Sequence, residues 1–93
     1  MPKIHYHPRF LSSFKRFARR NTQLQKQVNE KLLFFEKYPT HPSFHLEKLI
    51  KTKIWSIRLN KGNRLFFVWN KTKDTAIFFF IGPHDAYRTI GKK

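Results

Sequence analysis

The alternation of apolar and polar residues predicts a sheet in the C-terminal half of the chain. Between residues 55 and 59, apolar side chains at every second position alternate with Ser56 and Arg58, the period of a strand with one buried face. Gly62 and the asparagines at both ends of its turn tolerate positive φ angles, so they indicate a tight turn. We therefore expect a three-stranded antiparallel meander with strands at residues 54–60, 64–69 and 75–81.

Helical spacing dominates the N-terminal half. Residues 3–7 alternate as a short strand, and Pro8 then suits the first position of a helix, where a missing N–H costs nothing. Thr22 and Gln25 fit a capping box, so a second helix is expected to begin at Thr22 and to end before Pro39. The residues expected on the buried faces of the two helices are Phe10, Phe14, Phe17, Leu24, Val28, Leu32 and Phe35.

This order of elements is typical of a two-layer α+β domain. We expect a helical hairpin packed on a twisted antiparallel sheet, in the order β-α-α-β-β-β. The 93 residues are enough for one domain, spanning residues 1–93. The absence of cysteine excludes disulfides and cysteine-based zinc sites. No apolar run approaches the roughly 20 residues of a membrane span, and no secretion signal is evident, so we expect a cytoplasmic protein without membrane contact.

Basic residues dominate the charge of the chain. Twenty lysines and arginines face five acidic residues, which gives a formal net charge of +15. Such a surface attracts polyanions, so RNA, DNA and the ribosome are the expected partners. A membrane surface fits less well, because the basic residues are spread over the whole chain and do not line one amphipathic helix. The alternative is a solvated basic surface without a specific ligand.

Four segments of the sequence carry a further pattern. They are residues 42–49 (PSFHLEKL), 55–60 (WSIRLN), 63–67 (NRLFF) and 81–88 (IGPHDAYR). In this order, and at this length and charge, they resemble the RelE-, YafQ- and YoeB-like toxins of bacterial toxin–antitoxin pairs. The resemblance covers essentially the whole chain. It implies a compact ribonuclease fold, cleavage of mRNA, commonly in the A site of the ribosome, and neutralisation by a cognate acidic antitoxin.

The resemblance also implies roles for single residues. Arg64 corresponds to the strand arginine that the family places against the scissile phosphate, and Tyr87 corresponds to its tail tyrosine. His84 stands where relatives carry a histidine or a basic residue, and Arg58 takes the place of a basic residue in the second strand. Glu47 is in the region of the glutamate that serves as base in YoeB-like members. The paired strand lysines of RelE itself are not plainly present, which leaves the assignment of acid and base open.

Metal-free cleavage of RNA needs a base for the 2′-hydroxyl, cations for the phosphorane and an acid for the departing 5′-oxygen. Arg58 and Arg64 suit charge stabilisation, because a guanidinium binds phosphate oxygens through two hydrogen bonds and stays protonated. His84 titrates near neutrality and suits general acid or base catalysis, while Tyr87 can donate a hydrogen bond or stack on a base. We expect no cofactor and no metal. The further residues expected to contact RNA are Lys48, Lys51, Lys53, Lys61, Asp85 and Arg88.

Each assignment has an alternative. Without the resemblance, Arg64 could equally be an ordinary exposed arginine of a strand, and His84 could be a turn residue. Glu47 could simply pair with the surrounding lysines. A ParE-like gyrase inhibitor would share the expected fold but lack the catalytic set, and a basic RNA- or ribosome-binding domain would need charge alone. The histidine pairs at 5 and 7 and at 41 and 45 have a metal-like spacing, but there is no cysteine to complete a soft site.

Overall fold

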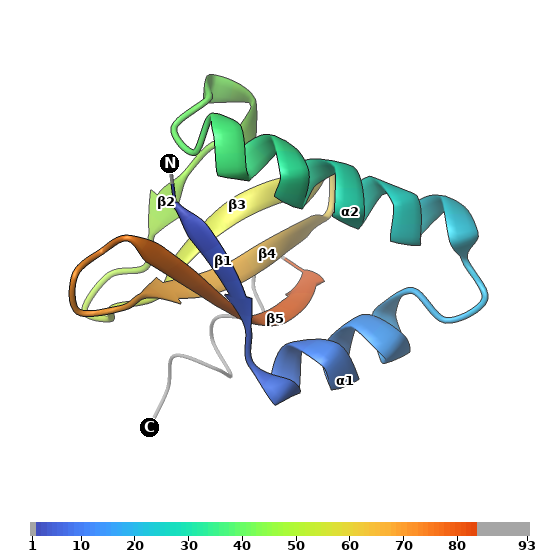
Figure 1. The fold of residues 1–93 in the computed structure, drawn as a ribbon. Helices are drawn as coiled ribbons and strands as arrows, with labels where there is room; N and C mark the ends of the chain where they lie inside the picture. The colour runs from blue at the N-terminus through green and yellow to red at the C-terminus, as the bar shows by residue number, and fades with distance from the viewer. Residues whose placement is uncertain (1, 84–93) are drawn as a thin grey trace.

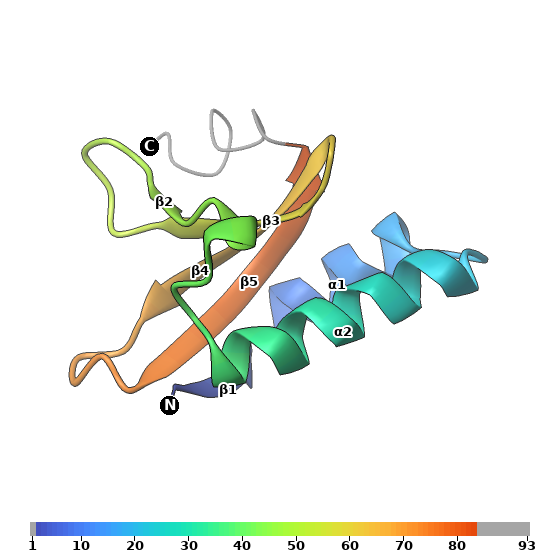
Figure 2. The same ribbon diagram turned by 90° about the horizontal axis from the view of Figure 1, so that it is seen from above.

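The computed structural model describes residues 2–83, which form a five-stranded sheet with two helices on one face (Figures 1 and 2). The strands lie in the order β1-β5-β4-β3-β2 across the sheet. The expected two-layer α+β architecture, a helical hairpin on a sheet, is therefore confirmed. No helix in this part of the chain is long and apolar enough to cross a membrane. In chain order the elements are β1 (Lys3–Tyr6), α1 (Pro8–Phe17), α2 (Thr22–Lys37), the 3-10 helix η1 (Pro42–Phe44), β2 (Glu47–Lys48), β3 (Trp55–Asn60), β4 (Asn63–Trp69) and β5 (Thr75–Pro83).

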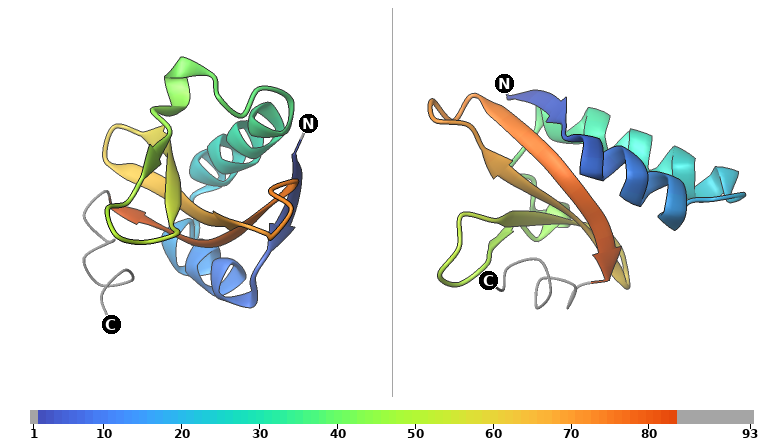
Figure 3. Two further views of the ribbon diagram at one scale, coloured as in Figure 1. Left: turned by 90° about the vertical axis from the view of Figure 1, so that its left-hand side faces the viewer. Right: turned by 90° about the horizontal axis from the view of Figure 1, so that it is seen from below.

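The sheet is mixed, whereas the sequence pattern predicts a fully antiparallel one. Strands β3, β4 and β5 form the expected antiparallel meander, but β1 pairs with β5 in parallel, with Ile4 opposite Ala76. The direction of β1 follows from the path of the helices, because α2 runs back against α1 (Figure 3). The end of α2 lies beside the start of the chain, where Pro2 shares a surface hollow with Glu36 and Lys37. The chain thus returns to the end of the sheet at which β1 begins.

The sequence pattern does not indicate β2, which is an edge strand of two residues. It pairs antiparallel with β3, with Glu47 opposite Ser56 and Lys48 opposite Trp55. A strand this short has no alternation that a periodicity argument could detect. Its position matters for function, because it carries two of the predicted site residues to the margin of the sheet.

The hydrophobic core lies between the helices and the central strands. Phe35 is at its centre, with its ring centroid 5.4 Å from that of Phe67 and 5.6 Å from that of Phe78, both in edge-to-face contacts. These contacts hold α2 against β4 and β5 and bury the apolar face of the sheet. Of the seven helical residues predicted to face the core, Phe10, Val28, Leu32 and Phe35 are buried, and Phe14, Phe17 and Leu24 are packed against the same core.

Side chains cap the start of both helices. Pro8 occupies the first turn of α1 as expected, and the ring nitrogen Nδ1 of His7 accepts a hydrogen bond from a first-turn amide at 3.0 Å. At α2 the cap is Asn21, whose Oδ1 accepts a hydrogen bond from the Leu24 amide at 3.0 Å. The prediction that Thr22 starts a capping box is therefore wrong, although α2 does begin at Thr22. Asparagine is one of the preferred N-caps because its short side chain reaches the free amides of the first turn.

The turn between β3 and β4 lies where the sequence predicts it, but it forms in a different way. No glycine in residues 2–83 has a positive φ angle. Instead, the Oδ1 of Asn60 accepts hydrogen bonds from the Gly62 amide and from the Nδ2 of Asn63, both at 3.1 Å. The asparagine side chain thus holds the turn closed, and the turn forms one wall of the site described next.

Candidate functional site

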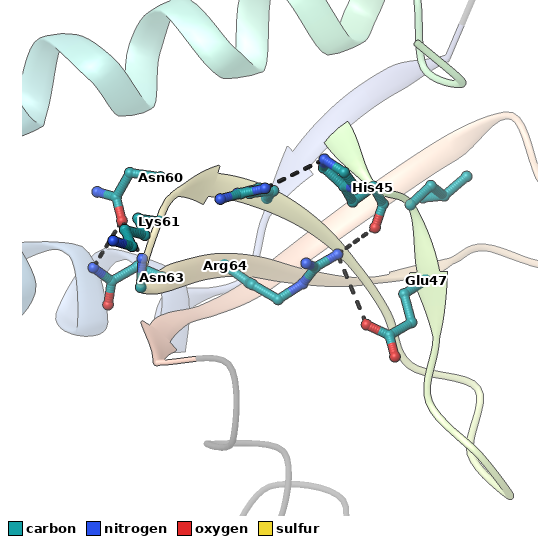
Figure 4. A pocket seen from close by; sticks show the side chains of 9 residues that line it. His45, Glu47, Asn60, Lys61, Asn63 and Arg64 are labelled. Atoms are coloured by element: carbon teal, nitrogen blue, oxygen red, sulfur yellow. Dashed lines mark hydrogen bonds and ion pairs between the residues drawn. The ribbon is translucent and has the colours of Figure 1, made fainter. Parts of the chain in front are cut away.

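A pocket of about 520 Å³ opens beside the β3–β4 turn (Figure 4). One wall comes from this turn and the adjoining ends of the two strands. The opposite wall comes from the segment that joins η1 to β2. The residues that line it are His45, Leu46, Glu47, Arg58, Asn60, Lys61, Gly62, Asn63 and Arg64.

Arg64 is buried in this pocket, with only 7% of its surface exposed. Its Nε donates to the Oγ of Ser56 at 2.7 Å, and its Nη2 donates to the backbone oxygens of His45 and, at 3.3 Å, of Ser56. Nη2 also lies 4.0 Å from the Oε1 of Glu47. The alternative of an ordinary exposed strand arginine is therefore wrong. The guanidinium is held in one orientation by groups on β3 and on the segment before β2.

The second terminal nitrogen of Arg64, Nη1, is the part left for a ligand. It makes no hydrogen bond within residues 2–83, and no side-chain nitrogen or oxygen there is both buried and unpartnered. Nη1 therefore keeps solvent-accessible surface. Burial lowers the pKa of Arg64, Glu47 raises it and Arg58 lowers it further. The guanidinium stays charged at neutral pH, because its ordinary pKa is above about 12.

His45 is a pocket residue that the sequence argument considered only as a metal ligand. Its backbone is left-handed, with φ at 47°, a conformation that costs most residues roughly 1–2 kcal/mol. This conformation directs its carbonyl oxygen to Arg64, and its Nε2 lies 3.3 Å from the Nη1 of Arg58. An arginine only donates hydrogen bonds, so in this contact Nε2 is the acceptor. His45 is the C-cap of η1, a position where a left-handed backbone is common, and nothing local in the sequence indicates its contact with Arg64.

Glu47 lies on the same side of the pocket as His45. Its carboxylate is close to the guanidinium of Arg64, and its side chain is about half exposed. A carboxylate near a fixed guanidinium is not simply a partner for surface lysines. Lys61 and Asn63 lie on the facing wall, so the described residues of the pocket provide three cationic side chains, one carboxylate and one imidazole.

Other predicted site residues lie elsewhere. Lys48 and Lys53 line a second groove at the far end of the sheet, and Lys51 is exposed in the β2–β3 loop with a left-handed backbone. In the pairing of β4 with β5, Gly82 lies opposite Arg64 and Pro83 opposite Asn63, so β5 ends beside the pocket. The remaining predicted residues, His84, Asp85, Tyr87 and Arg88, lie outside the described residues.

Two of the histidines weighed as metal ligands have structural roles. His7 caps α1, and the Nδ1 of His41 accepts a hydrogen bond from the Ser43 amide at 3.1 Å, at the start of η1. Within residues 2–83, no three histidine, aspartate or glutamate side chains gather into a cluster that could hold a metal ion. In the described part of the chain, the chemistry of the pocket rests on its arginines, Lys61, Glu47 and His45.

The arrangement fits a phosphate group. Arg58, Lys61 and Arg64 surround the hollow, and a guanidinium whose position is already fixed loses little entropy on binding an anion. The carboxylate and the imidazole stand beside these cations, where a proton can be taken from a hydroxyl next to the phosphate. The described pocket therefore combines cations suited to a phosphate with two groups suited to accept a proton.

No protein-family model and no curated protein sequence matches this chain. Solved toxin structures share its fold. A YoeB/ParE toxin from Agrobacterium tumefaciens has a TM-score of 0.71 at 13% identity, over 88% of this chain and 98% of the other. The YoeB–YefM complex from Staphylococcus aureus has a TM-score of 0.67 at 22% identity, over 90% of this chain and 98% of the other. The RelE–RelB complex from Pyrococcus horikoshii has a TM-score of 0.68 at 15% identity, over 91% of this chain and 97% of the other. The predicted RelE/YoeB-like fold is therefore confirmed.

Proposed function

We propose that this chain, which has the fold of YoeB and RelE toxins, is the toxin of a toxin–antitoxin pair and cleaves mRNA on the ribosome without a metal. The single observation that carries the proposal is the buried guanidinium of Arg64, fixed by Ser56 and His45 beside Arg58 and Glu47. A buried arginine with one accessible nitrogen in a cationic pocket is well suited to bind a phosphodiester. A purely structural arginine would not require Arg58 and Lys61 around it.

In the proposed reaction the scissile phosphate occupies the pocket, bound by Arg64, Arg58 and Lys61. These cations stabilise the extra negative charge of the phosphorane. The hydrogen bonds to Ser56 and His45 hold Arg64 in place before the substrate arrives, so little reorganisation accompanies the reaction. Preorganised charge of this kind is usually the largest single contribution to catalysis.

Two described groups can take the proton of the attacking 2′-hydroxyl. The first is the carboxylate of Glu47, and the second is the Nε2 of His45, which is freed when Arg58 turns to the phosphate. The acid for the departing 5′-oxygen is assigned to His84, with Tyr87 as a hydrogen-bonding or stacking group. Both lie outside the described residues and follow a strand that ends beside the pocket. Their roles rest on the sequence resemblance.

The proposal includes an acidic antitoxin as partner and a cytoplasmic location. The YoeB–YefM and RelE–RelB structures, which share the fold of this chain, are complexes of a toxin with its antitoxin. In this chain, a net charge of +15 favours an acidic partner. Leu33 and Tyr38 on and after α2 are 64% and 55% exposed, which offers apolar contacts to an amphipathic segment that folds on binding.

Induced expression in a host without the antitoxin tests the proposal. We expect the wild type to arrest growth and to cleave mRNA, and Arg58→Ala and His84→Ala to do neither while remaining folded. Arg16→Ala on α1 is the matched control, since it removes one exposed charge away from the pocket and should stay toxic. Growth arrest with intact mRNA in all variants would contradict the proposal and direct attention to gyrase. A wild type that is not toxic would leave only a basic binding domain.

A further inference from the structure

A second groove lies at the opposite end of β3 and β4 from the pocket, with a volume of about 440 Å³. Several of its residues come from the β2–β3 loop and the β4–β5 turn, which project beyond the end of α2 (Figure 1). We call it the tryptophan groove. The residues that define it are Trp55, Trp69, Lys48, Lys53, Lys71 and Lys73.

The two indole rings are fixed but not enclosed. Trp69 packs edge-to-face on Phe67, with ring centroids 5.3 Å apart, and its ring centroid lies 6.4 Å from that of Phe35. Both tryptophans are half-buried against the core. Neither indole N–H has a hydrogen-bond partner within residues 2–83, and no side-chain nitrogen there is both buried and unpartnered. Each indole N–H therefore keeps solvent-accessible surface.

Three lysines of the groove lie on hydrogen-bonded loops, and the fourth, Lys48, lies on β2. No ion pair within residues 2–83 involves any of them. In the β4–β5 turn the Oδ1 of Asn70 accepts hydrogen bonds from the amides of Asp74 and Thr75, at 3.0 and 3.2 Å. In the β2–β3 loop the hydroxyl of Thr52 donates to the Leu49 carbonyl at 2.9 Å. Two separate hydrogen-bonded loops thus present Lys53, Lys71 and Lys73, and β2 presents Lys48, at the groove lined by the two tryptophans.

We propose that the tryptophan groove binds a segment of single-stranded RNA, with a base against an indole ring and neighbouring phosphates on the lysines. Aromatic rings interleaved with basic side chains bind single strands in this way, because every base has a π-face and every nucleotide carries a charge. An acidic amphipathic peptide fits less well. Such a peptide inserts aliphatic anchors into a hydrophobic groove, and among residues 2–83 no aliphatic residue lines this one.

The groove and the pocket meet at β2. Glu47 lines the pocket and Lys48 lines the groove, since successive side chains of a strand point to opposite faces. Along β4, the five residue steps from Arg64 to Trp69 correspond to about 17 Å. An RNA strand that crosses the short edge strand β2 therefore reaches both sites. In this respect the inference rests on the proposed function, and the groove would hold nucleotides that flank the cleaved bond.

The two tryptophans that line the groove are the only tryptophans of the chain, so intrinsic fluorescence reports on it directly. We would titrate the wild type with a short 2′-O-methyl oligouridylate, which cannot be cleaved by 2′-hydroxyl attack. We expect quenching that weakens with salt. The double variant Lys53→Gln/Lys71→Gln should bind about tenfold more weakly, and the slope of log K against log salt should fall by about 0.7 for each lysine removed.

The matched control is Lys15→Gln/Arg19→Gln. It also removes two positive charges, but near the end of α1. We expect its affinity to change by less than about threefold. Circular dichroism checks that both variants fold. If the control variant bound RNA as weakly as the groove variant, or if heparin quenched the fluorescence as strongly as RNA, net charge alone would explain the binding and the proposal would be overturned. Quenching by an acidic peptide but not by RNA would overturn it in favour of a protein partner.

The same experiment separates this inference from the proposed function. Because the oligonucleotide is not cleaved, binding in the groove is expected even if the protein lacks nuclease activity. Quenching by RNA together with intact mRNA in the expression experiment would sink the nuclease proposal alone. Normal mRNA cleavage with no quenching, and with full activity of Lys53→Gln/Lys71→Gln, would sink the groove alone.

Discussion

The Nε of Arg64 donates to the hydroxyl of Ser56 at 2.7 Å, across the neighbouring strands β4 and β3. Ser56 is fully buried, although a polar residue at an alternating position in a strand is normally expected to face solvent. The serine is the acceptor that sets the plane of the guanidinium. One side-chain hydrogen bond on the face opposite the helices therefore links the stability of the sheet to the geometry of the pocket.

Ser56→Ala should lower both stability and activity. It leaves the buried Nε of Arg64 without its acceptor, which typically costs about 1–3 kcal/mol of unfolding free energy. Denaturant unfolding and RNA cleavage would be measured together. The control is Ser13→Ala, since Ser13 is also buried and exchanges hydrogen bonds with the backbone of Ile81, both at 3.0 Å. Ser13→Ala should lose stability but keep its cleavage rate per folded molecule. If Ser13→Ala and Ser56→Ala lowered that rate equally, the role of Ser56 would be contradicted.

Arg64→Met tests whether the arginine and the serine act together. The methionine fills similar space but leaves the buried hydroxyl of Ser56 and the carbonyl of His45 without their donor. We expect the free energy of unfolding to fall by roughly 2–4 kcal/mol and cleavage to be abolished. In a double-mutant cycle with Ser56→Ala, the coupling should be at least about 0.5 kcal/mol. Additive losses would show that the two side chains contribute independently.

The start of α2 distinguishes two candidate caps. Asn21→Ala should destabilise the protein by about 1 kcal/mol, because the amide of Leu24 loses its acceptor. Thr22→Ala should cost less, since Thr22 is the first residue of the helix and caps no amide. Thermal unfolding of the two variants side by side decides the point. A larger loss for Thr22→Ala would restore the capping box that the sequence predicts.

The β4–β5 turn should loosen in acid. A hydrogen bond from the Asn70 side chain lowers the pKa of the Asp74 carboxyl below its ordinary value of 3.8, and a hydrogen bond from Thr75 makes the next largest contribution. Because the folded pKa is the lower one, the stabilisation is complete above about pH 4 and is lost as the pH falls through the folded value. A carboxyl titration by NMR should give a midpoint below that of the unfolded chain, and Asn70→Ala should raise it. A midpoint at or above the ordinary value would contradict these hydrogen bonds.

Much of the fold could be predicted from the sequence because it rests on local periodicity. The meander and the helical hairpin both follow from apolar spacing, and their residues are buried as expected. The parallel pairing of β1 was not predictable in this way, because strand direction depends on the path of the helices. The cap at Asn21 was missed because Thr22 and Gln25 offered an equally plausible local pattern.

The candidate site was only partly predictable. Arg58, Glu47 and Lys61 do lie beside Arg64, but neither the burial of Arg64 nor the role of Ser56 has a local signal. His45 reaches the pocket through the left-handed backbone of the η1 C-cap, a local feature that does not indicate the contact with Arg64. Lys48 lies next to Glu47 in the sequence, yet it lines the other groove because adjacent side chains of a strand diverge.

The most direct test of the central claim is the chemistry of the RNA ends left by the purified protein on translating ribosomes. We predict cleaved mRNA with a 2′,3′-cyclic phosphate and a 5′-hydroxyl, as attack by the 2′-hydroxyl requires. A 2′-deoxy substitution at the cleaved nucleotide should abolish the reaction, and Arg58→Ala should slow it about 10²-fold without unfolding the protein. Intact mRNA, or cleavage that survives the 2′-deoxy substitution, would contradict the account.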